Sequence, residues 1–158
     1  NIDMLTVVAD SESTILAAIW TVRDWSFAPL GSLKQGQDVK ALVMLNPTRN
    51  FRGLNGNDAF RSALFTGRSG AAFPIIVAAD RSHSRDGKNI YDNMMRGRRS
   101  MEGNKRLDYY RFEMEEQERV VKSRRDGDRF LDDIIGGFIE ENVFNRRHDF
   151  RWQDRSPK

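Results

Sequence analysis

Apolar runs alternate with helical patterns along the first hundred residues of the chain. Three runs are typical of buried strands: residues 2–9 (IDMLTVVA), residues 39–45 (VKALVML) and the segment that starts at Phe73 (FPIIVAA). Asp10, Ser11 and Ser13 are helix-capping residues in front of the apolar pattern TILAAIWTV, and residues 58–65 predict a short second helix. Strands that alternate with helices predict an α/β fold of three layers, with a mostly parallel sheet.

One part of this pattern does not fit a regular parallel sheet. Residues 25–28 (WSFA), which Pro29 ends, predict another short strand shortly before the run at 39–45. A parallel crossover needs about a dozen residues, usually with a helix, and no helix is predicted in between. These two strands are therefore either antiparallel, or the chain departs from the alternating pattern here.

The pattern changes after Glu102, which suggests an α/β domain over residues 1–102 and a charged helical extension over residues 103–158. Spacing along one helical face predicts a first helix from Leu107, Tyr110, Met114 and Val121. A second amphipathic helix is predicted from Phe130, Leu131, Ile134, Ile135, Phe138 and Ile139. Gly136 and Gly137 cost this helix about 1 kcal/mol each relative to alanine, so we expect a kink or a close backbone contact there. Both helices are expected to pack on the α/β body or on a second copy of the chain.

Composition sets the limits of the molecule. The 158 residues, 39% hydrophobic and 31% charged, suit one soluble domain with a real core. No apolar run approaches the roughly 20 residues that span a bilayer, so no membrane span is expected. The chain has no cysteine, which excludes disulfides, a thiolate nucleophile and cysteine metal sites, and fits a cytoplasmic protein. Because a strand pattern starts almost at Asn1, we expect the chain to be a fragment of a longer protein.

Positive charge is concentrated between Arg81 and Arg129, in a chain whose net charge is +3 and whose pI is near 9.4. Over residues 105–129 the basic residues are interleaved with acidic ones, so pairs such as Glu115–Arg119 would neutralise much of this charge. The stretch MRGRRS has fewer acidic neighbours. Its arginines, together with Arg81, are the candidates for phosphate contacts with a nucleic acid: Arg96, Arg98 and Arg99. The alternative role of this cluster is to stabilise the end of a helix.

The polar loop from Ser82 to Lys88 (SHSRDGK) directly follows a predicted strand, and ligands of parallel sheets bind at the carboxyl ends of strands. It differs from a Walker A loop, so an ordinary turn with Gly87 at positive φ is the simpler expectation. Ser82, His83 and Asp86 are residue types of a catalytic triad, but a local run of this kind is usually a loop. Only one other histidine, His148, is present, without zinc-ligand spacing.

The order of motifs resembles the C-terminal half of ParA/MinD-type deviant P-loop ATPases. The motifs are Asp10-Ser11 with a following helix, DWSFAP, VMLNP, FPII, an arginine, and then Gly97 and Glu102. The resemblance implies a plasmid-partition or positioning ATPase that binds ATP and Mg²⁺, forms a homodimer and engages DNA. Within it, Asp10 corresponds to the catalytic, magnesium-linked Walker B aspartate. Asn46 and Pro47 correspond to the adenine pocket, and Arg81 or Arg85 to the loop arginine.

The chain departs from this family in one central respect, because its sequence contains no glycine-rich lysine loop for the phosphates. Without that loop these residues alone could not hydrolyse ATP. Two other hypotheses therefore stay open. One is a non-catalytic nucleic-acid-associated adaptor that uses the MRGRRS arginines and the tail RRHDFRW. The other is a small enzyme for nucleotides or phosphate esters, with its site in the Ser82–Lys88 loop.

Overall fold

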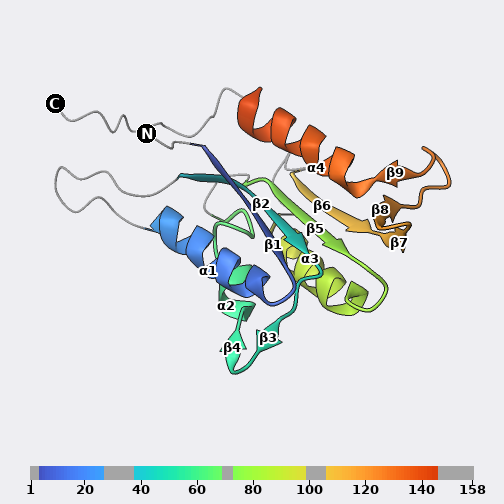
Figure 1. Ribbon diagram of the computed structural model, residues 1–158. Helices are drawn as coiled ribbons and strands as arrows, with labels where there is room; N and C mark the ends of the chain where they lie inside the picture. The colour runs from blue at the N-terminus through green and yellow to red at the C-terminus, as the bar shows by residue number, and fades with distance from the viewer. Residues whose placement is uncertain (1–3, 27–37, 69–72, 99–105, 146–158) are drawn as a thin grey trace.

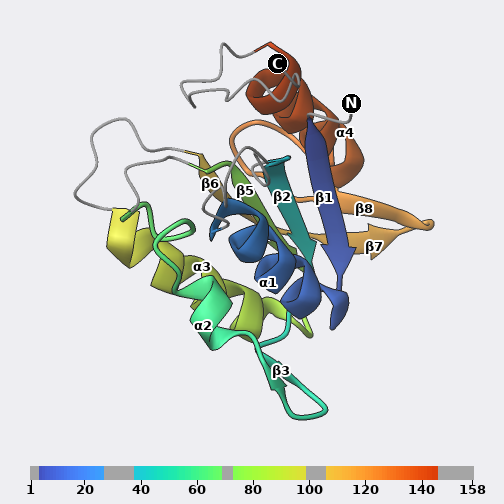
Figure 2. The same cartoon turned by 90° about the vertical axis from the view of Figure 1, so that its left-hand side faces the viewer.

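A four-stranded, wholly parallel sheet is the centre of the molecule. The computed structural model describes residues 4–26, 38–68, 73–98 and 106–145. The strands are β1 (Leu5–Asp10), β2 (Val39–Leu45), β5 (Ile75–Ala79) and β6 (Leu107–Arg111), and they lie in the order β1-β2-β5-β6 (Figure 2). The register sets Asp10 beside Leu45, Leu45 beside Ala78, and Ala79 beside Arg111. The carboxyl ends of all four strands therefore form one edge of the sheet.

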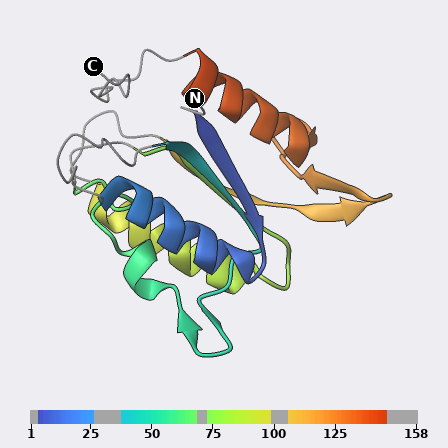
Figure 3. The ribbon, with the colours of Figure 1, turned by 60° about the vertical axis from the view of Figure 1, so that its left-hand side comes forward.

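Helices and a small second sheet cover the two faces of this sheet. The helices α1 (Ser13–Ser26), α2 (Asn57–Phe60) and α3 (Ser84–Arg98) pack on one face, next to the β3–β4 hairpin (Asn50–Phe51 and Leu54–Asn55). The other face carries α4 (Leu131–Ile139), which continues as a π-helix, η1 (Glu140–Phe144). Beside α4 lies an antiparallel sheet of β7 (Glu113–Glu115), β8 (Glu118–Val121) and β9 (Arg129–Phe130) (Figures 1 and 3). The predicted three-layer α/β fold is confirmed.

Strand β2 explains why the sequence VKALVML is almost continuously apolar. Every residue of this strand is buried, because both faces of a parallel sheet are covered. Leu42 and Met44 face the core under α1 and α3. Ala41, Val43 and Leu45 face the core under α4. The alternation of side chains along one strand thus links the two cores.

Helix α1 is longer than the sequence predicted. The strand expected at residues 25–28 is wrong for Trp25 and Ser26, because these two residues belong to the last turn of α1. Residues 27 and 28 lie outside the described residues. The turn is fixed by contacts to β2: Trp25 Nε1 donates to the carbonyl of Val39 at 2.8 Å, and the Val39 N–H donates to Asp24 Oδ2 at 3.1 Å. A helix connects the parallel pair β1 and β2, and this resolves the difficulty of the short connection.

The predicted helix from Leu107 to Val121 is also wrong, because these residues form β6, β7 and β8. The aromatic and branched residues of this segment favour strands. Positive φ angles of 46° at Glu116 and 75° at Gln117 form the tight turn between β7 and β8. Since β6 pairs with β5, the main sheet continues past residue 102, where the sequence placed the end of the α/β domain.

The second predicted helix is confirmed as α4. Ile134 and Phe138 are buried against β2 and β5, whereas Phe130 is 46% exposed. The close backbone contact expected at the glycine pair is absent: a Cβ atom on Gly136 or Gly137 would meet nothing within 4 Å. Among the described residues, no helix is long and apolar enough to cross a membrane.

Candidate functional site

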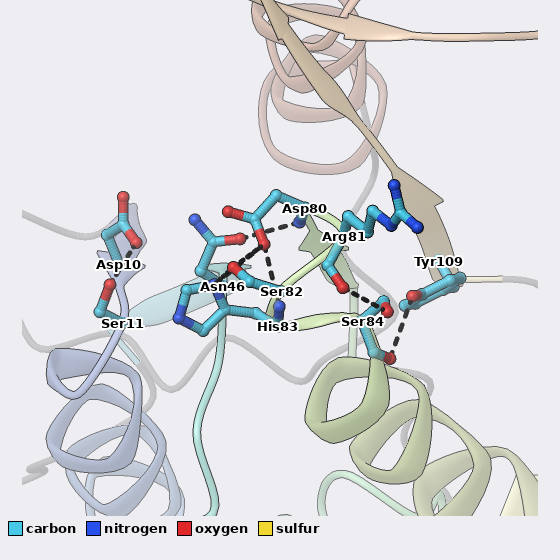
Figure 4. Close-up of polar contacts among 9 residues, drawn as sticks. All are labelled: Asp10, Ser11, Asn46, Asp80, Arg81, Ser82, His83, Ser84 and Tyr109. Carbon is cyan, nitrogen blue, oxygen red and sulfur yellow. Dashed lines mark hydrogen bonds and ion pairs between the residues drawn. The ribbon is translucent and has the colours of Figure 1, made fainter.

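Polar side chains follow the ends of three neighbouring strands. Asp10 ends β1, Asn46 follows β2 and Asp80 follows β5, so the three residues lie in line along the carboxyl edge of the sheet (Figure 4). Helices α1 and α3 begin just after β1 and β5, and their partially positive N-termini therefore lie at the same edge. This is the place where open α/β sheets bind their ligands.

Asn46 joins the ends of β2 and β5. Its backbone has a φ of 46°, a left-handed conformation that asparagine tolerates better than most residues. Its N–H donates to the carbonyl of Ala78 at 2.7 Å, and its side-chain Oδ1 accepts the N–H of Asp80 at 2.9 Å. The amide NH₂ of Asn46 has no hydrogen-bond partner within the described part of the chain. One face of this side chain is therefore structural, and the other can meet a ligand.

Asp80 is the centre of a hydrogen-bond cluster in front of α3. Its Oδ1 accepts the hydroxyl of Ser82 at 2.7 Å and the backbone N–H of His83 at 2.9 Å, and it lies 3.0 Å from His83 Nδ1. Burial of the carboxyl raises its pKa, but these hydrogen bonds lower it more, so the pKa of Asp80 falls from 3.8 to about 2. The carboxylate is therefore a fixed negative charge that also orders the loop.

This cluster does not have the geometry of a catalytic triad. The hydroxyl of Ser82 and the carboxylate of Asp80 both approach the same ring nitrogen, His83 Nδ1, at 3.0 Å. A triad needs the hydroxyl at one ring nitrogen and the carboxylate at the other. Asp86, the acidic residue of the sequence pattern, instead pairs with Arg49 Nε at 3.1 Å. The hypothesis of an enzyme with its site in the Ser82–Lys88 loop thus loses its activated nucleophile.

Most of the Ser82–Lys88 segment is helical, because α3 begins at Ser84. The expectation of a turn with Gly87 at positive φ is wrong: Gly87 is a buried residue of the first turns of α3. A Cβ atom there would lie only 2.9 Å from the Cβ of Ala79, so glycine allows α3 to approach β5 closely. Arg85 is exposed on the same helix, and Lys88 Nζ pairs with Asp92 at 2.8 Å.

Asp10 is exposed at the end of β1. It accepts the hydroxyl of Ser11 at 2.9 Å, and Arg119 Nη2 lies 3.9 Å from its Oδ2. In the described residues, no group of three histidine, cysteine, aspartate or glutamate side chains could hold a metal ion. Mg²⁺ often binds proteins through a single carboxylate together with waters and ligand phosphates. Asp10 therefore suits one such contact but does not form a complete metal site.

Of the basic residues predicted to contact nucleic acid, Arg81 and Arg96 are exposed and Arg98 is buried. Arg81 precedes α3 and Arg96 lies in its last turn, so roughly 20 Å of helix separates them. Arg98 is only 2% exposed, and it donates from Nε to the carbonyl of Phe65 and from Nη2 to that of Phe73, both at 2.8 Å. The prediction that Arg98 contacts DNA is therefore wrong in this structure, because its guanidinium holds two loops together. Arg99 and the tail RRHDFRW lie outside the described residues.

The buried position of Arg98 has an electrostatic consequence. Its Nη1 is buried and has no hydrogen-bond partner among the described residues, and burial lowers the pKa of the guanidinium to about 10. The group remains charged at neutral pH. It adds a positive charge to the interior at the end of α3.

Comparison with models of protein families, with curated proteins and with solved structures finds no match to this chain. The resemblance to partition ATPases thus stays a prediction. Sequence reasoning missed Asp80, although it follows the run FPIIVAA as directly as Asp10 follows the run IDMLTVVA. It also missed Arg49, whose partner Asp86 is 37 residues away, a distance at which the sequence carries no signal.

Proposed function

We propose that this chain is a nucleotide-binding α/β domain of the ParA/MinD-like partition or positioning type, which engages DNA. The observation that carries the proposal is the line of Asp10, Asn46 and Asp80 along the carboxyl edge of the sheet. The N-termini of two helices at this edge favour an anionic ligand such as a phosphate. The surface lies where a nucleotide would meet both polar side chains and helix ends.

Each residue has a separate role in this proposal. The amide NH₂ of Asn46, which has no partner among the described residues, donates to the adenine ring. Pro47 is buried and supports the loop beneath the ring. Arg81 or Arg85, both exposed near the start of α3, meets the phosphates. Asp10 binds a Mg²⁺ ion that the nucleotide brings, together with waters and phosphate oxygens.

Hydrolysis is not part of the proposal for these residues. The sequence offers no lysine loop to surround the phosphates, and the described residues show no activated nucleophile or complete metal site. ATP binding by this chain is therefore expected to be weak. In a longer protein that supplies such a loop, the same edge would contribute the base and magnesium contacts.

The experiment that tests nucleotide binding is a protein-detected NMR titration with Mg-ATP, because it registers weak binding. We expect the amides of Ser11, Asn46 and residues 80–83 to shift in a saturable way. Asn46→Ala should weaken binding by about 1–3 kcal/mol, since it removes a donor in the pocket. Arg23→Ala, an exposed arginine in the last turn of α1, is the matched control and should leave the affinity unchanged. Saturable shifts confined to other surfaces would refute the assignment.

DNA binding is the second part of the proposal, and it is supported by the exposed arginines Arg81 and Arg96. Each phosphate contact that is lost should lower the slope of log affinity against log salt by roughly 0.9. The measurement is a salt series with duplex DNA for wild type, Arg81→Ala and Arg96→Ala. Binding that needs no nucleotide would favour the adaptor hypothesis instead, and unchanged slopes would remove both arginines from the DNA surface.

A homodimer completes the proposal. Helix α1 exposes three large apolar side chains, of which Trp20 is 49% exposed; the others are Leu16 and Ile19. Exposed apolar side chains that lie together often mark an interface. Sedimentation of wild type and Ile19→Asp, with and without nucleotide, tests this part. A monomer at all concentrations would exclude it.

A further inference from the structure

A basic cavity that is widely open to solvent lies at the end of α3 opposite the candidate nucleotide edge. Its volume is about 400 Å³, which is within the usual size range of small-molecule sites. The lining residues come from the turns after α2 and from the last turns of α3: Arg61, Thr66, Arg68, Asn93, Arg96 and Gly97. Three of these six residues are arginines, and none is an aspartate or a glutamate.

One wall of the cavity is held by its own hydrogen bonds. The hydroxyl of Thr66, a residue only 3% exposed, donates to the carbonyl of Ser62 at 2.7 Å and accepts from Arg68 Nε at 3.1 Å. Arg68 Nη2 donates to the carbonyl of Arg61, also at 3.1 Å. The guanidinium of Arg68 is thus oriented in advance, and its remaining donors have no partner among the described residues, so they can meet a ligand. Such orientation lowers the entropy that binding would cost.

The two walls of the cavity touch at Gly97. A Cβ atom on this residue would lie 2.5 Å from the Cβ of Thr66 and 2.6 Å from its carbonyl oxygen. The end of α3 can therefore approach the turn at Thr66 only because residue 97 is glycine. This contact fixes Arg96 relative to Arg61 and Arg68, which come from a segment some thirty residues away.

The positive charge of the cavity has no acidic counterpart among the described residues. Across the described ranges, no Asp or Glu oxygen lies within ion-pair distance of Arg61, Arg68 or Arg96. Stabilisation of the C-terminus of α3 explains one arginine, Arg96, because that residue is in the last turn. It does not explain Arg61 and Arg68, which follow a four-residue helix.

We infer that this cavity binds a compact phosphate dianion, either inorganic phosphate or a phosphomonoester. Guanidinium groups match phosphate oxygens with two parallel hydrogen bonds, and several of them together distinguish a doubly charged phosphate from singly charged anions. A concave site suits a compact group better than the extended backbone of a duplex. The inference does not rest on the proposed nucleotide site, from which the length of α3 separates it.

The test is calorimetric titration with inorganic phosphate and, separately, with glycerol 3-phosphate, a phosphomonoester without a nucleobase, at constant ionic strength. Arg61→Ala and Arg68→Ala should each weaken binding about tenfold or more, because each removes a charge-assisted hydrogen bond. Arg68→Lys should fall between wild type and Arg68→Ala, since it keeps the charge and loses the paired donors. Arg23→Ala, an exposed arginine on another helix, is the control and should bind phosphate as the wild type does.

The outcomes separate the sources of the phosphate and the competing explanations. Tighter binding of glycerol 3-phosphate than of free phosphate identifies a phosphomonoester ligand, and the reverse identifies inorganic phosphate. Thermal melting checks that Arg68→Ala, which loses two internal hydrogen bonds, remains folded; if it does not, Arg61→Ala decides alone because its side chain makes neither of those bonds. Equal phosphate affinity of Arg61→Ala and wild type would overturn the inference. The inference would also be overturned if these substitutions lowered the affinity for duplex DNA but left the affinity for phosphate unchanged.

Discussion

Asn46 Oδ1 accepts the backbone N–H of Asp80 at 2.9 Å, so one side chain at the end of β2 holds the first residue after β5. Because Asp80 in turn binds the backbone N–H of His83, this bond connects the strand ends to the start of α3. Asn46, which the family resemblance places in the adenine pocket, therefore also holds the edge of the sheet together. Mutations at this position have to separate the two roles.

Substitutions of Asn46 should show how much its hydrogen bond and its left-handed backbone each contribute to stability. Asn46→Ala should lower the free energy of unfolding by about 1–2 kcal/mol, from the lost hydrogen bond and from the strain of a left-handed alanine. Asn46→Gly loses the same hydrogen bond without that strain, so it should be less damaging. Urea unfolding of both variants measures the difference. Equal stabilities would show that the φ of 46° carries no cost.

The charge of Asp80 should make stability depend on pH in the acidic range. Its pKa is about 2 in the folded protein and near the ordinary 3.8 in the unfolded chain, so the unfolded state binds a proton first as the pH falls. The stabilisation is complete above about pH 4 and is lost toward pH 2. It amounts to about 1–2 kcal/mol after solvent screening.

Unfolding of wild type and Asp80→Asn over this pH range provides the measurement. The variant should be less stable at neutral pH and should show a shallower decline on acidification. A decline as steep as that of the wild type would assign the acid sensitivity to other carboxylates.

Replacing the exposed glycines of α4 by alanine should stabilise the protein. A Cβ atom at Gly136 or Gly137 would meet nothing within 4 Å, so alanine there should gain about 0.5–1 kcal/mol of stability each through higher helix propensity. Gly87→Ala is the contrasting variant, because its Cβ would lie 2.9 Å from that of Ala79 and should destabilise the protein. Thermal melting would contradict this account if all three substitutions shifted the midpoint in the same direction.

The docking of α4 rests on its buried face. Ile134→Asp places an unpaired charge where only 6% of the residue is exposed, and it should cost about 3 kcal/mol or more. Phe130→Asp is the matched control, because Phe130 is 46% exposed and the substitution should cost far less. Melting together with light scattering decides the matter. If Ile134→Asp kept the wild-type midpoint, α4 would have to be independent of the sheet.

The sequence could predict the elements whose own residues determine them. Strand β2 is recognisable because a strand covered on both faces is apolar at every position, and α4 because its apolar residues follow one helical face. The end of α1 could not be recognised, since Trp25 is helical through its bond to Val39, fourteen residues away. A helix is wrongly predicted for residues 107–121 because the spacing of Leu107, Tyr110 and Met114 fits a helical face. The pairing of β6 with β5 instead makes the first part of this segment a strand.

The same division holds for the candidate site. Asp10 and Asn46 could be placed at strand ends, because the apolar runs in front of them end there. The basic cavity could not, since Arg61 and Arg96 become neighbours only when Gly97 packs against Thr66. Arg98 illustrates the opposite failure: nothing in MRGRRS distinguishes the buried arginine from the exposed Arg96.

The edge strand β1 can accept a further strand. In the described part of the chain, β1 pairs only with β2, and Val8 on this strand is 53% exposed. An added strand could continue the hydrogen-bond ladder there without moving any of the existing pairs. An insertion or a fused segment would then enlarge the sheet by accretion at one side, and the two cores under α1 and α4 would be left as they are.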